Sequence, residues 1–195
     1  MADRPSELGA LAGASLLITG AEGMLGRAFV EHLAGVSGAR VLGLGHGALD
    51  VTDRAAVLAL VSERPDIIVH CAADVDAERC EANPENCRRI QVGGTENVVE
   101  LAARTGARLL YPQSFLIFDG ATLPITEETA PAPLSVYGRC KLEAERLALE
   151  RADGAISVRM AGFFGGDEKD KNFVGKFTRH LVALLEGGVA TYGVG

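Results

Sequence analysis

The chain has 195 residues, enough for one domain with a full hydrophobic core or for a domain and a fragment of another. Hydrophobic residues make up 48% and charged residues 23%, which is typical of globular proteins. The net charge of −7 disfavours nucleic acids and anionic membranes as main partners. Because no apolar stretch has the length of a membrane span and the N-terminus does not resemble a signal peptide, we expect a cytoplasmic protein.

Apolar runs of strand length alternate with longer amphipathic stretches along the chain. Continuous apolar strands are typical of parallel sheets that are buried on both faces. The alternation therefore predicts an α/β fold, a doubly wound parallel sheet of the Rossmann type with helices on both faces. In chain order, the pattern predicts a strand at 15–19, a helix at 23–33, a strand at 40–44, a helix from Thr52 or Asp53 to 63, a strand at 66–70, a helix at 84–104, a strand at 108–111, a helix at 137–151, a strand at 155–159 and a helix at 172–186.

Three parts of the chain are expected from this pattern. Residues 1–14 form an N-terminal tail, residues 15–170 form the Rossmann domain, and residues 171–195 begin an incomplete substrate-binding part. The segment 120–136 interrupts the alternation and contains three prolines. A loop of this length is usually functional or disordered.

Three glycines, Gly20, Gly23 and Gly26, directly follow the first predicted strand. Gly20 permits a sharp turn, Gly23 lets the backbone approach a pyrophosphate, and Gly26 lets the helix pack against the sheet. The N–H groups at the helix start would then face the phosphates. A glycine-rich turn without a ligand is the alternative, but its place after the first strand favours a dinucleotide.

The choice between NAD and NADP depends on the end of the second strand. An acidic residue there would bind the ribose 2′-hydroxyl of NAD. The strand instead ends in Leu44, Gly45, His46 and Gly47, and Asp50 follows later. The missing carboxylate removes one barrier to a 2′-phosphate, so the sequence slightly favours NADP.

Tyr137 and Lys141 begin the most strongly patterned helix, and their i, i+4 spacing places both on one helical face. A phenol has an ordinary pKa of about 10, which an adjacent ammonium would lower toward neutrality. Ser114 follows the fourth strand, at the edge where such sheets bind ligands, and would polarise a carbonyl. A chance pair and a turn serine are the alternatives, but the combination favours a catalytic set.

Other polar residues are expected to be structural. His70 ends a buried strand and is expected to be hydrogen-bonded there. The acidic residues of 74–85 are expected to form a solvated loop and helix start, and we expect no metal site. Cys140, beside Lys141, either has a lowered pKa or is a helix residue without a role. Reduced thiols are expected for all four cysteines, Cys71, Cys80, Cys87 and Cys140.

Together these segments resemble the extended short-chain dehydrogenase/reductase family, and within it the dTDP-4-dehydrorhamnose reductases. The glycine turn and the Tyr/Lys pair are typical of the wide family, whereas Asp50 and the segment 118–120 indicate the narrower one. The likeness covers nearly all of the chain from Leu16 onward. The segments that carry it are 19–26, 49–53, 65–73, 94–97, 118–120 and 133–145, together with Arg159.

The resemblance implies a reductase of a 4-keto sugar nucleotide. Hydride would pass from the nicotinamide to the keto carbon, Tyr137 would protonate the alkoxide, Ser114 would hold the oxygen, and Lys141 would tune Tyr137. An epimerase or dehydratase of the same fold would share these residues. The implied cofactor contacts, beyond the glycine turn, Tyr137 and Lys141, are Met24, Leu25, Asp50, Val51, Ala72, Ala73 and Asp74.

The sequence departs from these reductases in several places. Phe115 stands where relatives carry an acid, and Gln91 where they carry Asn. Family members continue beyond the position of Gly195 into a part of about a hundred residues, so half of the sugar-nucleotide cleft is expected to be absent. A second resemblance, through 69–73 and 131–134, is to the regulatory subunit of methionine adenosyltransferase. It implies a non-catalytic NADP-binding subunit with a partner enzyme. A homodimer and an inactive fragment are further alternatives.

Overall fold

A computed structural model of the protein describes residues 7–162 and 173–188. The chain divides into two compact units, Met1–Ala161 and Gly162–Gly195. The described part of the second unit contains the helix α7 (Phe173–Glu186), close to the helix predicted at 172–186. The domain boundary predicted at residue 170 lies outside the described residues. Within the described ranges, no helix combines the length and apolar character needed to cross a membrane.

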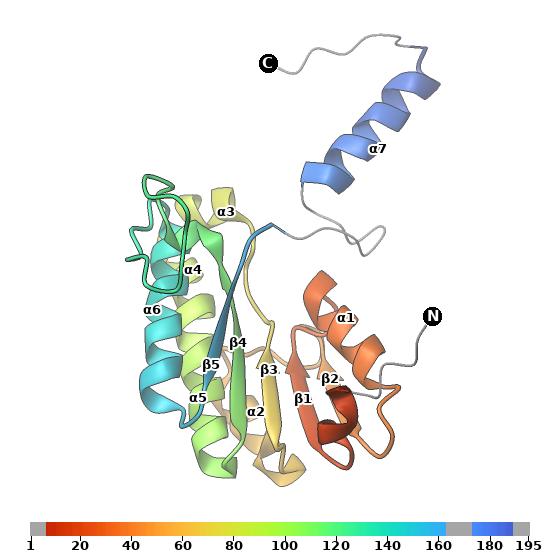
Figure 1. Ribbon diagram of the computed structural model, residues 1–195, viewed down its shortest axis with the longest axis vertical. Coiled ribbons are helices and arrows are strands. Elements are labelled where there is room, and N and C mark those ends of the chain that lie inside the picture. The colour runs from red at the N-terminus through yellow and green to blue at the C-terminus, as the bar shows by residue number, and fades with distance from the viewer. Residues whose placement is uncertain (1–6, 163–172, 189–195) are drawn as a thin grey trace. The chain divides into compact units, whose positions relative to one another are not determined.

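The described residues form one parallel sheet of five strands in the order β2-β1-β3-β4-β5 (Figure 1). This order confirms the predicted doubly wound parallel α/β fold. β4 runs three residues past its predicted end, because it continues to pair with β5 after its pairing with β3 stops at Leu110. Pro112, which has no N–H, is tolerated in this part of β4. The strands are β1 (Ser15–Thr19), β2 (Arg40–Leu44), β3 (Ile67–His70), β4 (Arg108–Ser114) and β5 (Ile156–Met160).

The helices follow the predicted pattern with two corrections. The helix predicted at 84–104 is interrupted by a π turn at Arg89–Gly93 and ends at Gly106, whose φ is 73°. The stretch 74–85 was expected to be a solvated loop and helix start, but it contains a further short helix because the Asp76 carboxylate caps it. The helices of the first unit are α1 (Met24–Leu33), α2 (Arg54–Ala59), α3 (Ala77–Ala82), α4 (Pro84–Arg88), α5 (Gly94–Thr105) and α6 (Val136–Arg151).

Helices cover both faces of the sheet. Leu16 and Ile18 of β1 pack with α1 on one face, while Leu17 between them packs with α2, α5 and α6 on the other. Successive strand residues point to opposite faces, so both faces of β1 must be apolar. This arrangement explains why the strands are continuous apolar runs rather than alternating ones.

The chain order of the strands creates a switch point between β1 and β3. From β1 the chain crosses through α1 to β2 at one edge, and then returns through α2 to β3 on the other side of β1. Thr19 and His70 are the last paired residues of these two strands. In open α/β sheets, ligands bind outside the carboxyl ends of the strands at such a point.

Candidate functional site

The glycine turn after β1 is held by close backbone contacts. Gly20 has a φ of 65°, and a Cβ built there would lie 2.6 Å from the nitrogen of Ala72. A Cβ at Gly26 would lie 2.3 Å from the carbonyl oxygen of Gly20. Since both neighbours are backbone atoms, a side chain at either position would have to move the main chain. The turn is therefore pressed between α1 and the end of β3.

Helix α1 begins directly after this turn with Gly23 as its N-cap. Within residues 7–162 and 173–188, no side chain caps this N-terminus. The first N–H groups of a helix lack intrahelical partners and form the positive end of its dipole. The backbone of Met24 and Leu25 therefore fits a pyrophosphate, and the residues present fit a dinucleotide at this turn.

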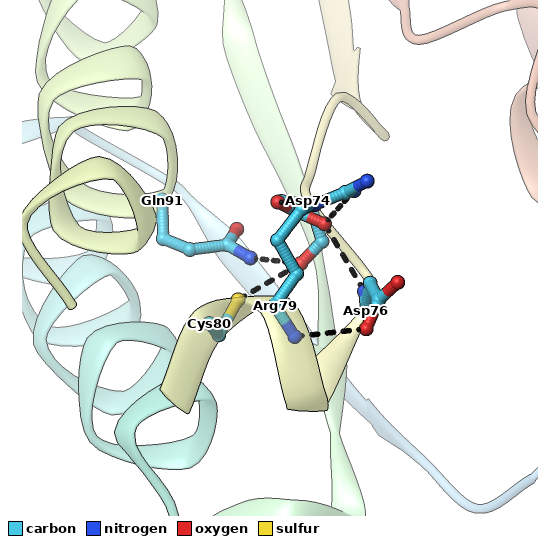
Figure 2. A network of polar contacts seen from close by, with 5 residues as sticks. All are labelled: Asp74, Asp76, Arg79, Cys80 and Gln91. Carbon is cyan, nitrogen blue, oxygen red and sulfur yellow. Dashed lines mark hydrogen bonds and ion pairs between the residues drawn. The ribbon is translucent and has the colours of Figure 1, made fainter. Parts of the chain in front are cut away.

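The loop after β3 is pinned by the side chains of Figure 2. The buried Asp74 carboxylate accepts hydrogen bonds from Nε of Arg79 at 2.8 Å and from the N–H of Asp76 at 3.1 Å. Nη2 of Arg79 also pairs with it. The Asp74 carbonyl accepts a hydrogen bond from Nε2 of Gln91 at 2.5 Å. Gln91 lies in the π turn before α5, at the position where the reductases carry Asn. Its side chain thus anchors this loop.

This loop also contains Ala72 and Ala73, the other residues expected to contact a cofactor on this side. The N–H of Ala72 donates to Oγ1 of Thr19 at 3.3 Å, which ties the loop to the end of β1. The carboxylate of Asp74 forms an ion pair with Arg79. Asp74 would therefore contact a cofactor while it remains paired with Arg79. The cofactor contacts of Ala72, Ala73 and Asp74 stay predictions.

Asp50 and Val51 lie in the loop that follows β2. The Asp50 carboxylate accepts hydrogen bonds from the N–H of Thr52 at 2.9 Å and from its hydroxyl at 2.8 Å, and these bonds lower the pKa of Asp50. Val51 is buried, and a Cβ built at Gly94 would lie 2.7 Å from its Cγ2. Asp50 is therefore an ionised surface group and Val51 a packing residue, while their predicted contact with an adenine stays a prediction.

His70 is a neutral, hydrogen-bonded residue at the end of β3. Burial lowers the pKa of its imidazole to about 3, and the charge of Lys141 acts in the same direction. The Thr95 hydroxyl donates to the Gln91 carbonyl at 2.6 Å and lies 3.2 Å from Nε2 of His70, so it accepts the Nε2 proton. Nδ1 then accepts from the Thr19 hydroxyl at 2.8 Å. The predicted structural role of His70 is confirmed.

Tyr137 and Ser114 meet where α6 begins and β4 ends. A Cβ at Gly138 would lie 2.3 Å from the carbonyl oxygen of Leu116, so only glycine lets the helix approach this closely. Burial raises the pKa of the Tyr137 phenol to about 12, and a hydrogen bond with Ser114 lowers it in part. The expectation that Lys141 lowers this pKa is wrong for this geometry, because burial outweighs every other influence.

The Lys141 side chain is buried. Its Nζ donates to the carbonyl of Pro112 at 2.9 Å and lies 4.0 Å from the ring centroid of Tyr111. An ammonium over an aromatic face is attracted by the ring quadrupole. Burial still lowers the pKa of Lys141 to about 7, although the nearby Cys71 and Glu145 favour its charged form. Lys141 therefore changes charge near neutral pH.

Gln113 links the candidate catalytic residues and was not singled out in the sequence. Its Nε2 donates to the carbonyl of Lys141 at 3.0 Å, while its Oε1 accepts from the N–H of Ser114 at 2.8 Å. A single buried amide thus joins the end of β4 to the middle of α6. Because the predicted strand ended at 111, no signal in the sequence indicated that Gln113 occupies a buried position of β4.

Glu145 and Arg159 form a second link, between α6 and β5. The Glu145 carboxylate accepts from Nε of Arg159 at 3.0 Å and from the Ser157 hydroxyl at 2.6 Å. These contacts lower the pKa of Glu145 against the opposing effect of burial. The sequence comparison marked both residues through the family resemblance, but it did not indicate that they pair.

Three cysteines, Cys80, Cys87 and Cys140, gather in a buried cluster with Tyr137 and Val92. Burial raises the pKa of all three thiols, so the alternative of a lowered pKa at Cys140 is wrong. All four cysteines lie in the described part of the chain and are free thiols. Among the described residues, no group of three or more His, Cys, Asp or Glu side chains is placed to hold a metal ion.

The fold and the site define an α/β protein with a glycine turn at the switch point of its sheet and a Tyr/Lys helix beside it. Residues 14–185 match the RmlD substrate binding domain family, and the chain belongs to that family.

Two kinds of relatives are similar to this chain. Methionine adenosyltransferase 2 subunit beta of Xenopus tropicalis is 39% identical over 165 residues, which cover 80% of this chain and 49% of that protein. A dTDP-4-dehydrorhamnose reductase of Streptomyces griseus is 37% identical over 166 residues, which cover 84% of this chain and 54% of that protein. The chain thus spans about half the length of the curated relatives it matches.

Solved structures agree with this family. The dTDP-4-dehydrorhamnose reductase of Bacillus anthracis in complex with NADP superposes with a TM-score of 0.79 at 30% identity, over 86% of this chain and 60% of that chain. Other solved neighbours are in complex with NAD. Dinucleotide complexes thus occur among proteins that share this fold.

Proposed function

We propose that the protein is an NAD(P)-dependent reductase that acts on the keto group of a 4-keto sugar nucleotide in the cytoplasm. The observation that carries this proposal is the meeting of Ser114 and Tyr137 at the carboxyl edge of the sheet, with Lys141 one turn further along α6. The substrate class is supported by the similarity to dTDP-4-dehydrorhamnose reductases.

The dinucleotide would be held mainly by backbone. The N-terminus of α1 would bind the pyrophosphate, and the loops after β2 and β3 would flank the adenine and the nicotinamide half. Lys141, on the same helical face as Tyr137, would hydrogen-bond the ribose beside the nicotinamide. The proposed cofactor-binding residues are Gly20, Gly23, Met24, Leu25, Gly26, Asp50, Val51, Ala72, Ala73, Asp74, Tyr137 and Lys141.

The bound dinucleotide would supply the hydride. The side chains of this protein would supply the proton and hold the reacting oxygen. Tyr137 donates its phenolic proton to the oxygen of the reduced carbonyl, and a pKa of about 12 keeps that proton in place at neutral pH. The Ser114 hydroxyl donates a hydrogen bond to the same oxygen and holds it near the phenol. Lys141 would act through its hydrogen bond to the ribose rather than through the pKa of Tyr137.

Turnover tests the proposal directly. The full chain, given a dTDP-4-keto-6-deoxy sugar, should oxidise NADH or NADPH. Tyr137→Phe should lower kcat by about 10²- to 10⁴-fold, the usual contribution of a general acid. The same variant should unfold cooperatively on heating as the unchanged chain does, which separates lost chemistry from lost folding. Absence of turnover with every nucleotide-keto sugar would contradict the reductase.

A second candidate is a non-catalytic dinucleotide-binding subunit that regulates a partner enzyme. The identity with methionine adenosyltransferase 2 subunit beta favours it. Phe115 also favours it, since a half-exposed aromatic ring follows Ser114 where the reductases carry an acid. Tight dinucleotide binding without turnover, together with co-purification of a partner enzyme, is the result expected of this candidate. Product analysis would distinguish a reductase from an epimerase or dehydratase.

A further inference from the structure

The glycine turn carries a carboxylate to the end of β2. Gly45 follows β2, at the place where an acidic residue would recognise the ribose of NAD. A Cβ built at Gly45 would lie 2.2 Å from Cδ and 2.5 Å from Oε1 of Glu22. Gly45 is buried while Glu22 is exposed. The Glu22 side chain therefore lies over Gly45 and occupies the space that a side chain at position 45 would fill.

A backbone hydrogen bond joins the residues next to Glu22 and Gly45. The N–H of Ala21 donates to the carbonyl of Leu44 at 3.1 Å, which ties the glycine turn to the end of β2. The Gly45 carbonyl accepts from the N–H of Leu49 at 2.9 Å, which closes the turn after the strand. The backbone of Glu22 is thus held beside the turn that contains Gly45, and its carboxylate lies over Gly45.

A dinucleotide bound at the glycine turn directs its adenosine ribose toward the end of the second strand. A carboxylate there accepts a hydrogen bond from the 2′-hydroxyl of NAD. It repels the 2′-phosphate of NADP, because like charges a few ångströms apart interact strongly beside a protein surface. We propose that Glu22 is the residue by which this site selects NAD over NADP, an inference that rests on the proposed dinucleotide-binding function.

Two positively charged groups, His46 and Arg89, act on Asp50 beyond the end of β2. His46 and Asp50 lie close together, since the charge of His46 lowers the pKa of Asp50. Arg89, which acts on Asp50 in the same way, donates to the hydroxyl of Thr52 at 2.5 Å. The sequence slightly favoured NADP because no acid follows β2 directly, whereas the tertiary contact brings one from a different strand end.

Direct binding of NADH and NADPH to the full chain, measured by calorimetry or cofactor fluorescence, tests this proposal. The unchanged chain should bind NADH at least about tenfold more tightly than NADPH. Glu22→Gln should reduce that ratio by about tenfold, because it removes the charge and keeps the size of the side chain. The matched control is Glu150→Gln, which removes the same charge from the exposed far end of α6 and should leave the ratio unchanged.

A rescue variant tests position rather than charge alone. Glu22→Ala should lose the preference for NADH. Gly45→Asp on the Glu22→Ala background should restore it, because the carboxylate returns to the same place from β2. Gly45 is not among the described glycines with positive φ, so an aspartate fits its backbone. Cooperative thermal unfolding of each variant confirms that it is folded.

The outcomes separate this inference from the proposed function. If the unchanged chain binds neither NADH nor NADPH, the dinucleotide-binding function itself fails. If it binds both equally, or NADPH more tightly, the selection by Glu22 is overturned while dinucleotide binding stands. An unchanged ratio in Glu22→Gln, or a double variant without restored preference, also overturns the role of Glu22.

Discussion

The two halves of the candidate site consist of different kinds of groups. Around β1 and α1, the site consists of backbone and glycines in steric contact, as at Gly20 and Gly26. Around β4 and α6, it consists of buried ionisable side chains such as Tyr137, Lys141 and Glu145. The first half depends on space, and the second depends on how burial and partners set each charge. Substitutions in the first half should therefore act equally at every pH, and those in the second should not.

The largest effect is expected at Gly20. Gly20→Ala combines a left-handed φ of 65° with a contact to the backbone of Ala72, and should lower the free energy of unfolding by about 3–5 kcal/mol. Gly154 has nearly the same φ, 64°, with no atom of the described chain within 4 Å of a built Cβ. Gly154→Ala should therefore lose only about 1 kcal/mol. Urea denaturation at pH 6 and pH 9 measures the stability of both variants. A Gly154→Ala loss as large as that of Gly20→Ala would refute the steric explanation.

The next effect is expected at the link between α6 and β5. Arg159→Met leaves the Glu145 carboxylate buried without its cation and should lower the free energy of unfolding by about 3 kcal/mol at pH 7. Folding lowers the pKa of Glu145 from 4.5, so the pair stabilises the chain above that pH and loses its effect as the pH falls through the folded value. The loss should shrink in acid.

Arg104→Met is the matched control for this pair, because Arg104 bonds Glu100 at a largely exposed position. Its loss should stay below about 1 kcal/mol. Urea denaturation at pH 7 and pH 4 measures both variants. An Arg159→Met loss as small as that of Arg104→Met would show that Glu145 is not effectively buried.

Substitution of Lys141 should stabilise the chain, in contrast to the variants above. Its pKa falls from 10.5 to about 7 on folding, so the unfolded chain binds more protons between these values and stability rises with pH across this range. Lys141→Met removes the buried charge, and should be more stable than the unchanged chain by about 2 kcal/mol at pH 6. This advantage should disappear toward pH 10. A difference that does not vary with pH would contradict the buried position of the ammonium.

The smallest effect is expected at Asp53, the N-cap of α2, which accepts from the N–H groups of Ala55 and Ala56. Asp53→Ala should lower the free energy of unfolding by about 1 kcal/mol. Asp153→Ala removes an exposed aspartate from the turn after α6, and should change it by less than about 0.5 kcal/mol. Thermal unfolding of the two variants side by side checks the cap.

Local patterns predicted most of the fold because each depends on neighbouring residues. The apolar run before Gly20 identified β1, and the two candidate caps Thr52 and Asp53 placed the start of α2, where the structure has Asp53 as the N-cap. The extension of β4 was missed because Pro112 normally ends a strand, and only the absence of β3 alongside it permits the proline. Helix α3 was missed because it has only six residues, too few to show a clear apolar period.

By itself, the sequence determined the parallel α/β fold, the glycine turn and the pairing of Tyr137 with Lys141 on one helical face, since periodicity and spacing encode all three. Only the tertiary structure decided the charge state of these groups, because desolvation depends on everything packed around a side chain. It also decided that Glu22 covers Gly45, since the two residues come from different strand ends and meet only when the sheet forms. A carboxylate that is absent from the end of β2 in the sequence is present there in space.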